Sequence, residues 1–384
     1  MKIKNWRVTL GWFLMLLVSS CVEPYSPKVM EAPNSFLVVN GFINSNGPTT
    51  IQLLRTQNLS DESTPPAETG AVVKIEAENG ENYRLQDIGG GNYTIGSLTL
   101  NPAVKYRLFI KTRDNKEYVS DFIEVKQTPA IDEVTWKAVD NEVQFFVSTH
   151  DPKNDTRYYR WEFEDTWHFR PAFPTIFKYE NGAIRIRDDR DEEISNCWRT
   201  ERSTTIELSN SARLSKDVIS NYKLLALPYN SERVAIKYSL LVKQYALSRQ
   251  AYEYWEILKK NTESIGTLFD PLPSQLTSNI RCTTNPEEPV IGFLSASTMQ
   301  EKRIFLESKD LPREWRLFNP TCIADTMLLS QGNIVDYFKG GYNMPVSEVY
   351  PPSGGMFPIG YVYASRACVD CTVRGTNVKP DYWE

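Results

Sequence analysis

Val104-Lys105-Tyr106-Arg107-Leu108-Phe109-Ile110 is rich in β-branched and aromatic residues, which favour an extended strand. Similar short runs flank it between Phe36 and about Val125, and Phe36-Leu37-Val38-Val39 is typical of a buried strand. Turn-forming pairs separate these runs at Asn46-Gly47, Asn79-Gly80 and Asp114-Asn115. Regularly spaced short strands of this kind predict a mainly β protein that begins with an immunoglobulin-like or prealbumin-like β-sandwich at 35–127.

A second β-rich domain, also a sandwich, is expected over residues 128–384. Its strand runs are interrupted at 166–230 by a long insertion of mixed aromatic and charged residues, which should hold structure or a function of its own. Ser248 is a good helix N-cap residue, and apolar residues recur on one face after it, so a helix is expected over about 249–260. From Tyr350 onward the chain is loop-rich and contains cysteines, which predicts an irregular, disulfide-bearing region.

The N-terminus has the pattern of an export signal. Three basic residues precede an apolar run at 8–18, and Ser19-Ser20-Cys21 follows it. The cysteine after small residues resembles a bacterial lipobox, and the run is shorter than the roughly 20 residues that span a membrane. We therefore expect a signal peptide at 1–20, a lipid on Cys21 and a proline-containing tether at 21–34. The alternative is an ordinary secretory signal with an incidental cysteine.

Charge and hydropathy restrict the partners. The formal net charge is −5, and it becomes −8 once the three basic residues of the signal peptide are removed. Such a chain has no general attraction for nucleic acid. No other stretch is apolar enough to span a membrane, so acyl chains on Cys21 are the expected membrane attachment.

Five cysteines follow Cys21, and the compartment beyond the inner membrane favours disulfides. Because five is odd, at least one has no partner within the chain. We expect Cys197 to be free and two bridges of open connectivity to form among Cys282, Cys322, Cys368 and Cys371. The spacing Cys368-Val-Asp-Cys371 also admits a zinc site or a redox pair, but poor helix formers follow it and the compartment is oxidising.

Catalytic motifs are scarce. The chain has two histidines, His150 and His168, and neither a Gly-x-Ser-x-Gly nor a His-Glu-x-x-His pattern. The acidic run at 188–193 lacks the alternation and the glycine of a calcium-binding loop. We predict no catalytic residue, metal or cofactor, although a glycosidase using two carboxylates stays open.

Aromatic residues are dense after position 157, and sugar-binding and protein-binding surfaces both favour them. This pattern predicts a binding surface, against the alternative that part of the set is core. The candidate residues are Tyr158, Tyr159, Trp161, Trp167 and Phe169.

Short blocks in a specific order resemble the DUF4249 family of Bacteroidota lipoproteins. They are Phe36 to Gly41, Cys197-Trp198-Arg199, Lys237 to Tyr245, Phe269 to Ser274, Asn279-Ile280-Arg281-Cys282 and a tail from Asp370-Cys371 to Lys379 through Trp383. One departure is Gly375-Thr376-Asn377, where members often have two glycines.

This resemblance implies an outer-membrane lipoprotein of unknown activity, often encoded beside a TonB-dependent receptor. It supplies no catalytic residue, and it implies structural roles for Cys282 and the tail cysteines. We therefore expect a non-enzymatic, lipid-anchored outer-membrane protein that assists a TonB-dependent transporter, with a glycan or peptide as a further ligand. The alternatives are a glycan-acting hydrolase with paired carboxylates and a structural or adhesive envelope protein. The lone acidic residue Glu23 beside Cys21 leaves either face of the membrane open.

Overall fold

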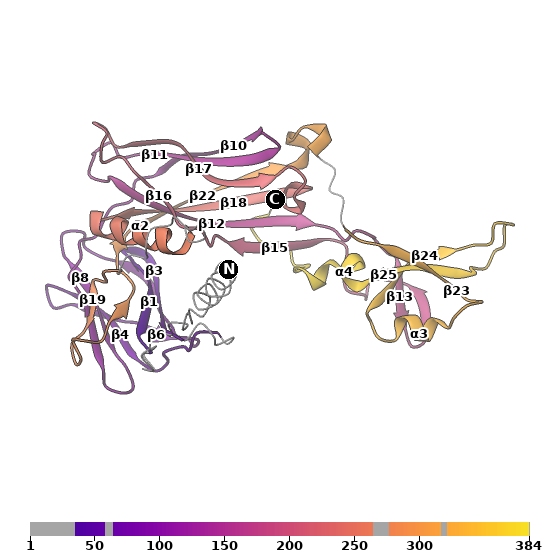
Figure 1. The fold of residues 1–384 in the computed structure, drawn as a ribbon, viewed down its shortest axis with the longest axis horizontal. Coiled ribbons are helices and arrows are strands. Elements are labelled where there is room, and N and C mark those ends of the chain that lie inside the picture. The colour runs from indigo at the N-terminus through magenta and orange to yellow at the C-terminus, as the bar shows by residue number, and fades with distance from the viewer. Residues whose placement is uncertain (1–34, 58–63, 264–275, 316–320, 384) are drawn as a thin grey trace, which may run out of the picture.

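The computed structural model describes residues 35–57, 64–263, 276–315 and 321–383. The signal peptide, Cys21 and the tether lie outside the described residues. The described chain is mainly β and forms two sandwiches and a smaller distal lobe (Figure 1). None of the helices in these ranges is long and apolar enough to cross a membrane.

The N-terminal sandwich consists of two five-stranded sheets packed face to face. One has the order β20-β1-β3-β7-β6, with bounds Val290–Ile291, Leu37–Gly41, Asn46–Arg55, Asn92–Thr99 and Gln86–Asp87. The other has the order β19-β9-β8-β4-β5, with bounds Ile280–Cys282, Glu117–Ser120, Tyr106–Lys111, Val72–Ala77 and Asn82–Arg84. Alternate residues of β8 are buried, so the strand predicted from Val104–Ile110 is confirmed with its bounds shifted toward Lys111.

Three short strands from far along the chain complete this sandwich, which corrects its expected limits of 35–127. Besides β19 and β20, β21 (Ala296–Ser297) pairs in parallel with β2 (Ile43–Asn44). Cys282 and Val290 join the same buried core as Leu37 and Ile51. Residues 280–297 therefore belong with the first domain and not with the second.

In the second sandwich, a three-stranded sheet packs on a five-stranded sheet. The first sheet is β10-β11-β17, with bounds Ile131–Val139, Glu142–His150 and Val218–Pro228. The second is β15-β12-β18-β22, with bounds Cys197–Arg202, Tyr158–Phe169, Lys237–Leu247 and Met299–Glu307, and β16 (Glu207–Asn210) also pairs with β12. The expected insertion at 166–230 is thus wrong for most of its length, because β15, β16 and β17 are strands of the sandwich.

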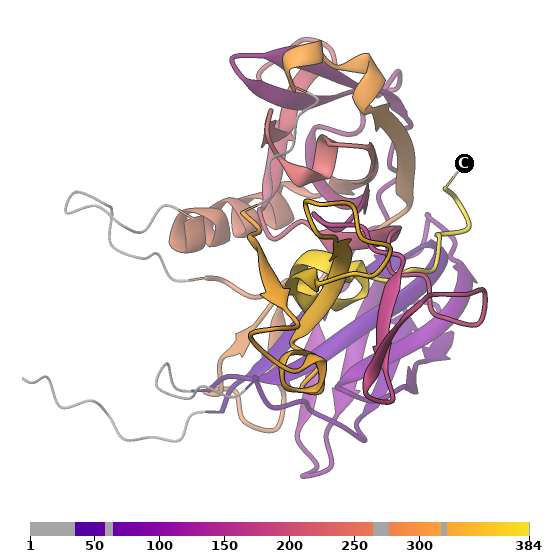
Figure 2. The ribbon, with the colours of Figure 1, turned by 90° about the vertical axis from the view of Figure 1, so that its right-hand side faces the viewer.

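Only the middle of that segment leaves the second sandwich. The hairpin β13 (Phe177–Glu180) and β14 (Ala183–Ile186) joins the distal lobe. The lobe also contains the sheet β23-β25-β24, with bounds Ala324–Leu328, Gly360–Ser365 and Asn343–Val349, and the helices α3 (Ile334–Phe338) and α4 (Arg366–Val369). Figure 2 looks onto this lobe and shows the two sandwiches one above the other behind it.

The longest described helix, α2 (Arg249–Glu263), follows β18 directly. The Ala251 amide donates to the Ser248 hydroxyl at 3.1 Å, so the predicted N-cap and helix are confirmed. Single turns of 3₁₀-helix occur at Glu232–Val234, Ser308–Asp310, Arg313–Trp315 and Cys371–Val373.

The cysteine pairing corrects the prediction in one respect. Disulfides join Cys197 to Cys371 and Cys322 to Cys368, while Cys282 is free and buried. The expected free Cys197 and bridged Cys282 were therefore wrong. The reason is the path of the C-terminal segment, which returns to the start of β15, whereas Cys282 lies inside the N-terminal sandwich.

Candidate functional site

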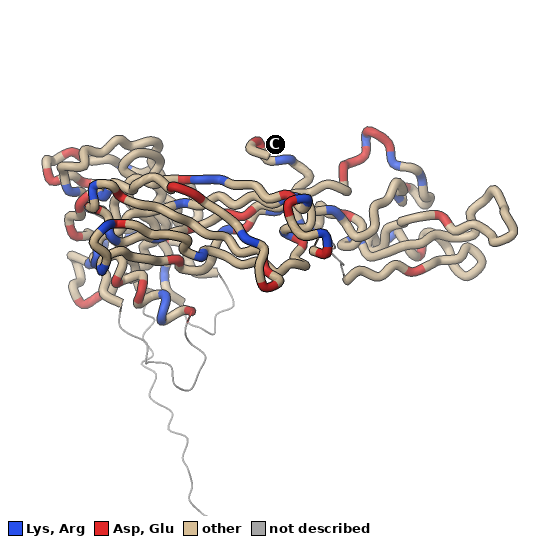
Figure 3. Tube along the Cα trace, turned by 90° about the horizontal axis from the view of Figure 1, so that it is seen from above, with Lys and Arg blue, Asp and Glu red and all other residues tan. Residues whose placement is uncertain are grey.

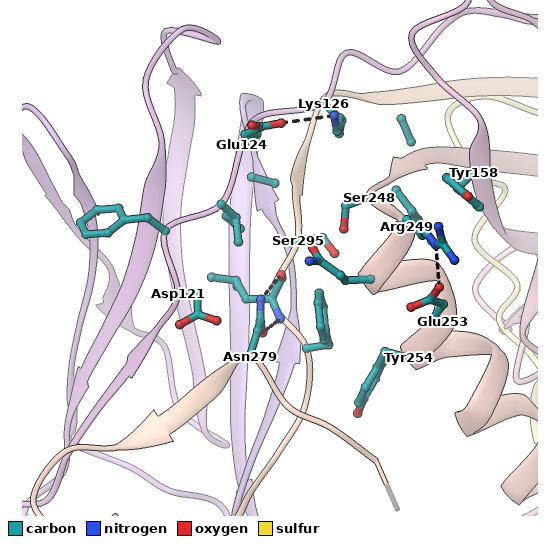
Figure 4. A pocket seen from close by; sticks show the side chains of 18 of the residues that line it. Asp121, Glu124, Lys126, Tyr158, Ser248, Arg249, Glu253, Tyr254, Asn279 and Ser295 are labelled. Atoms are coloured by element: carbon teal, nitrogen blue, oxygen red, sulfur yellow. Dashed lines mark hydrogen bonds and ion pairs between the residues drawn. The ribbon is translucent and has the colours of Figure 1, made fainter. Parts of the chain in front are cut away.

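A cleft of about 780 Å³ lies where the N-terminal sandwich meets α2 and the ends of β12 and β18 (Figure 4). Six segments line it: Lys105 before β8, the chain after β9, the approach to β12, the end of β18 with the start of α2, the residues before β19 and the residues leading into β21. Both sandwiches therefore contribute side chains. Hollows between domains are a common place for small ligands.

The helix α2 forms one wall of the cleft, and two of its residues pack into the protein interior. Ala251 and Tyr254 are buried on its inner face. The ring centroid of Tyr254 lies 5.3 Å from that of Phe293, which belongs to the opposite wall. Burial raises the pKa of Tyr254, and a backbone hydrogen bond from Gly292 opposes that shift. Tyr254 therefore stays a neutral phenol beside the cleft.

The opposite wall is fixed by side chains that bond to backbone. Asn279 donates to the Leu294 carbonyl at 2.9 Å and accepts from the Leu294 amide at 2.8 Å. The Ser278 hydroxyl donates to the Gly292 carbonyl at 2.6 Å. These bonds join the segment before β19 to the segment before β21, so this wall is ordered without a bound ligand.

Three of the carboxylates that line the cleft are ion-paired, two with bases of the cleft and one with Arg281 outside it. Arg249 lies 2.8 Å from Glu253 and Lys126 lies 3.4 Å from Glu124, and Asp121 bonds to Arg281 at 2.6 Å. The four carboxylates that line the cleft (Asp121, Glu124, Asp155 and Glu253) are all exposed to solvent. A general acid needs a buried or apolar setting that raises its pKa, and exposure does not provide one. Hydrogen-bonding groups beside the faces of Phe122, Tyr158 and Phe293 are better suited to binding.

Neither histidine lines this cleft. The exposed His150 lies 2.8 Å from Asp132, and this carboxylate raises the pKa of His150 by hydrogen bonding and charge. His168 is stacked on Trp198 and bonds to Asn196 at 3.2 Å, and burial lowers its pKa. Among the described residues, the side-chain hydrogen bonds of the two histidines go to Asp132 and Asn196 and not to a serine, threonine or cysteine.

The predicted aromatic binding surface is wrong for four of its five residues. Tyr159, Trp161, Trp167 and Phe169 are buried in the core of the second sandwich. The reason is that β12 is an inner strand, paired with β18 on one edge and with β15 and β16 on the other. Only Tyr158 is partly exposed, and it lines the cleft with its ring centroid 5.1 Å from that of Tyr252 on α2.

The acidic run at 188–193 is held by basic neighbours. Asp191 lies 2.6 Å from both Lys178 and Arg185, and these hydrogen bonds hold its pKa far below the usual range. Over the described ranges, no three His, Cys, Asp or Glu side chains are grouped so that they could hold a metal ion.

Sequence reasoning missed the cleft, although one signal pointed to it. The predicted cap at Ser248 places α2, and α2 supplies Arg249, Glu253 and Tyr254 to one wall. The other wall depends on Asn279 and Phe293, which lie next to β19 and β20, and these strands pair with β9 and β1 from much earlier in the chain. No local pattern indicates that pairing.

Comparison with known proteins places the chain in a family without an assigned activity. The family described as "Domain of unknown function (DUF4249)" matches residues 22–303. This match includes all residues of the cleft and the hairpin β13–β14, and it stops within β22, before β23, β24 and β25 of the distal lobe and before the tail block. No curated protein matches the chain. Among solved structures, a two fibronectin type-III domain segment from chicken tenascin is 10% identical, with a TM-score of 0.16, over 54% of this chain and 90% of that one.

Proposed function

The chain belongs to the DUF4249 family, and from that premise we propose that it is a non-enzymatic outer-membrane lipoprotein that assists a TonB-dependent transporter. Acyl chains on Cys21 attach it to the membrane. The cleft between the two sandwiches holds the transported cargo, a glycan or a peptide.

The observation that carries this proposal is the chemistry of the cleft. Its carboxylates are exposed and three of the four are ion-paired, while the lining also offers neutral polar groups and aromatic faces. Such a lining supports recognition by hydrogen bonding and ring stacking rather than acid–base catalysis. The ordered walls support binding without a large rearrangement.

The N-terminal sequence supports the location. The basic, apolar and small-residue segments before Cys21 are the parts of an export signal, and the tether after it separates a lipid from the folded body. A protein held in this way stays close to the transporters of the same membrane, which raises its effective concentration toward them.

The test is affinity purification of the tagged lipoprotein from membranes solubilised in mild detergent. The proposal expects a TonB-dependent transporter to be recovered with the parent protein, and it expects Tyr158→Ala/Arg249→Ala, two changes in the cleft, to reduce the glycan or peptide that is recovered with it. Lys309→Ala, an exposed residue outside the cleft, serves as the matched control. Absence of any transporter, under conditions that preserve a known transporter complex, would contradict the proposal.

A further inference from the structure

The free end of the distal lobe is formed by a stretch of chain without charged residues. Residues 349–365 contain no Asp, Glu, Lys or Arg, although these types make up 24% of the chain. The run consists of the last residue of β24, the turn that follows and all of β25. Figure 3 shows this end of the lobe as a stretch almost without charged positions.

Large apolar side chains are exposed at the same place. Met356 is 88% exposed and Phe357 is 79% exposed, and both lie in the turn between β24 and β25. Tyr350, Ile359 and Leu329 beside them are exposed as well. We call these five residues the apolar tip. Contiguous apolar surface of this kind marks an interaction site in soluble proteins.

Backbone hydrogen bonds order the apolar tip. The Ile359 amide donates to the Val349 carbonyl at 2.7 Å, and the Gly354 amide donates to the Pro351 carbonyl at 3.1 Å. The Leu329 amide donates to the Ile359 carbonyl at 2.9 Å, which brings Leu329 beside the turn. The exposed side chains are therefore presented by a folded hairpin.

Two tyrosines of this hairpin bond to carboxylates through their hydroxyl groups. The Tyr350 hydroxyl donates to Glu348 at 2.6 Å, and the Tyr363 hydroxyl donates to Asp325 at 3.3 Å. Tyr350, itself part of the apolar tip, is thus intermediate between the apolar side chains and a carboxylate. Tyrosine takes this intermediate position at the boundary between lipid and water, because one end of the ring is apolar and the other is polar.

We infer that the apolar tip is a second membrane contact, which inserts into the headgroup boundary of a lipid surface without net charge. Glu348 and Asp325, which accept hydrogen bonds from Tyr350 and Tyr363, are acidic and would not attract anionic lipid. The inference rests on the proposed lipid anchor, since acyl chains at Cys21 bring the lobe near a membrane. Two separate attachments hold a protein more firmly than one and restrict how its long axis lies on the membrane.

The test measures binding of the unacylated mature chain, made without its signal peptide and with Cys21→Ser, to phosphatidylcholine vesicles by sedimentation. Removing two inserted side chains with Met356→Ser/Phe357→Ser should lower the partition coefficient by at least about tenfold. Ile323→Ser/Tyr342→Ser is the matched control, since both residues are exposed on the same lobe at the opposite end of its sheet. This control should bind like the parent, and circular dichroism should show that all three proteins are folded.

Adding phosphatidylglycerol or salt should change this binding little, because no cation of the apolar tip is involved. Equal binding by the tip variant and the parent, no binding by the parent, or binding only to anionic vesicles at low salt would each overturn the inference. So would a photoreactive group at position 357 that crosslinks to a protein, and not to lipid, in whole cells. Because the assay uses unacylated protein, its failure leaves the proposed anchor at Cys21 to be judged by lipid labelling.

Discussion

Cys371 forms a disulfide with Cys197, which lies 174 positions earlier in the chain. The bond joins the C-terminal segment to the first residue of β15, where the Cys371 amide also donates to the Ile194 carbonyl at 3.0 Å. Beyond the disulfide, the amides of Trp198 and Thr376 each donate to the carbonyl of the other. The C-terminal segment therefore covers the edge strand of the second sandwich, where unpaired backbone groups would otherwise be exposed.

Replacing this disulfide should destabilise the second sandwich. We expect Cys197→Ser/Cys371→Ser to lower the free energy of unfolding by about 2–5 kcal/mol, because the unfolded chain is no longer constrained by a long loop. Urea denaturation followed by tryptophan fluorescence measures the change. Cys282→Ala, at the free cysteine, keeps both disulfides and is the control for loss of a thiol. An unfolding midpoint unchanged in the double variant would show that the bridge is dispensable.

Trp161 should be a core residue and not a ligand contact. It is fully buried, its indole Nε1 donates to Gln244 at 2.8 Å, and it stacks between Tyr159 and Tyr222. Trp161→Ala should therefore cost about 3–5 kcal/mol of stability through loss of packing. Thermal and urea unfolding test this, with the partly exposed Tyr158 on the same strand as the matched site. A fully stable Trp161→Ala protein that loses a partner would restore the surface interpretation.

The two histidines should titrate on opposite sides of their usual pKa of 6.5. Asp132 raises the pKa of His150, so this interaction is fully present below pH 6.5 and is lost as the pH rises through the raised value. Burial lowers the pKa of His168. The stability that its neutral form contributes is therefore fully present above pH 6.5 and is lost as the pH falls through the lowered value.

NMR can follow both residues, because the chain contains no other histidine. Asp132→Asn should bring the pKa of His150 back toward 6.5 and leave that of His168 unchanged. His168 is therefore the internal control. Identical titration of the two rings in the parent would refute the assigned environments.

Short sequence patterns correctly predicted the elements that depend on residues close together in the chain. The strand around Val104–Ile110 and the cap at Ser248 depend on residue type and on neighbours within a few positions, and both are present. The pairing of β1 with β20, where Leu37 lies opposite Val290, depends on contacts between distant segments. The same is true of the cysteine pairs and of the inner position of β12. The cleft lies where such distant segments meet, so its residues carry no local signature.

The membrane attachment should depend on Cys21 more than on any other residue. Cys21→Ser removes the thiol that would carry the acyl chains, and we expect loss of lipid labelling and a shift of the protein from the membrane to the soluble fraction. The apolar tip adds a refinement. A weak residual membrane association should persist in Cys21→Ser and vanish when Met356→Ser/Phe357→Ser is added, because one inserted hairpin holds far less firmly than acyl chains. Fractionation of the parent, the single variant and the combined variant separates the two contributions. Unchanged labelling and unchanged membrane retention in Cys21→Ser would show that the cysteine after the export signal is incidental.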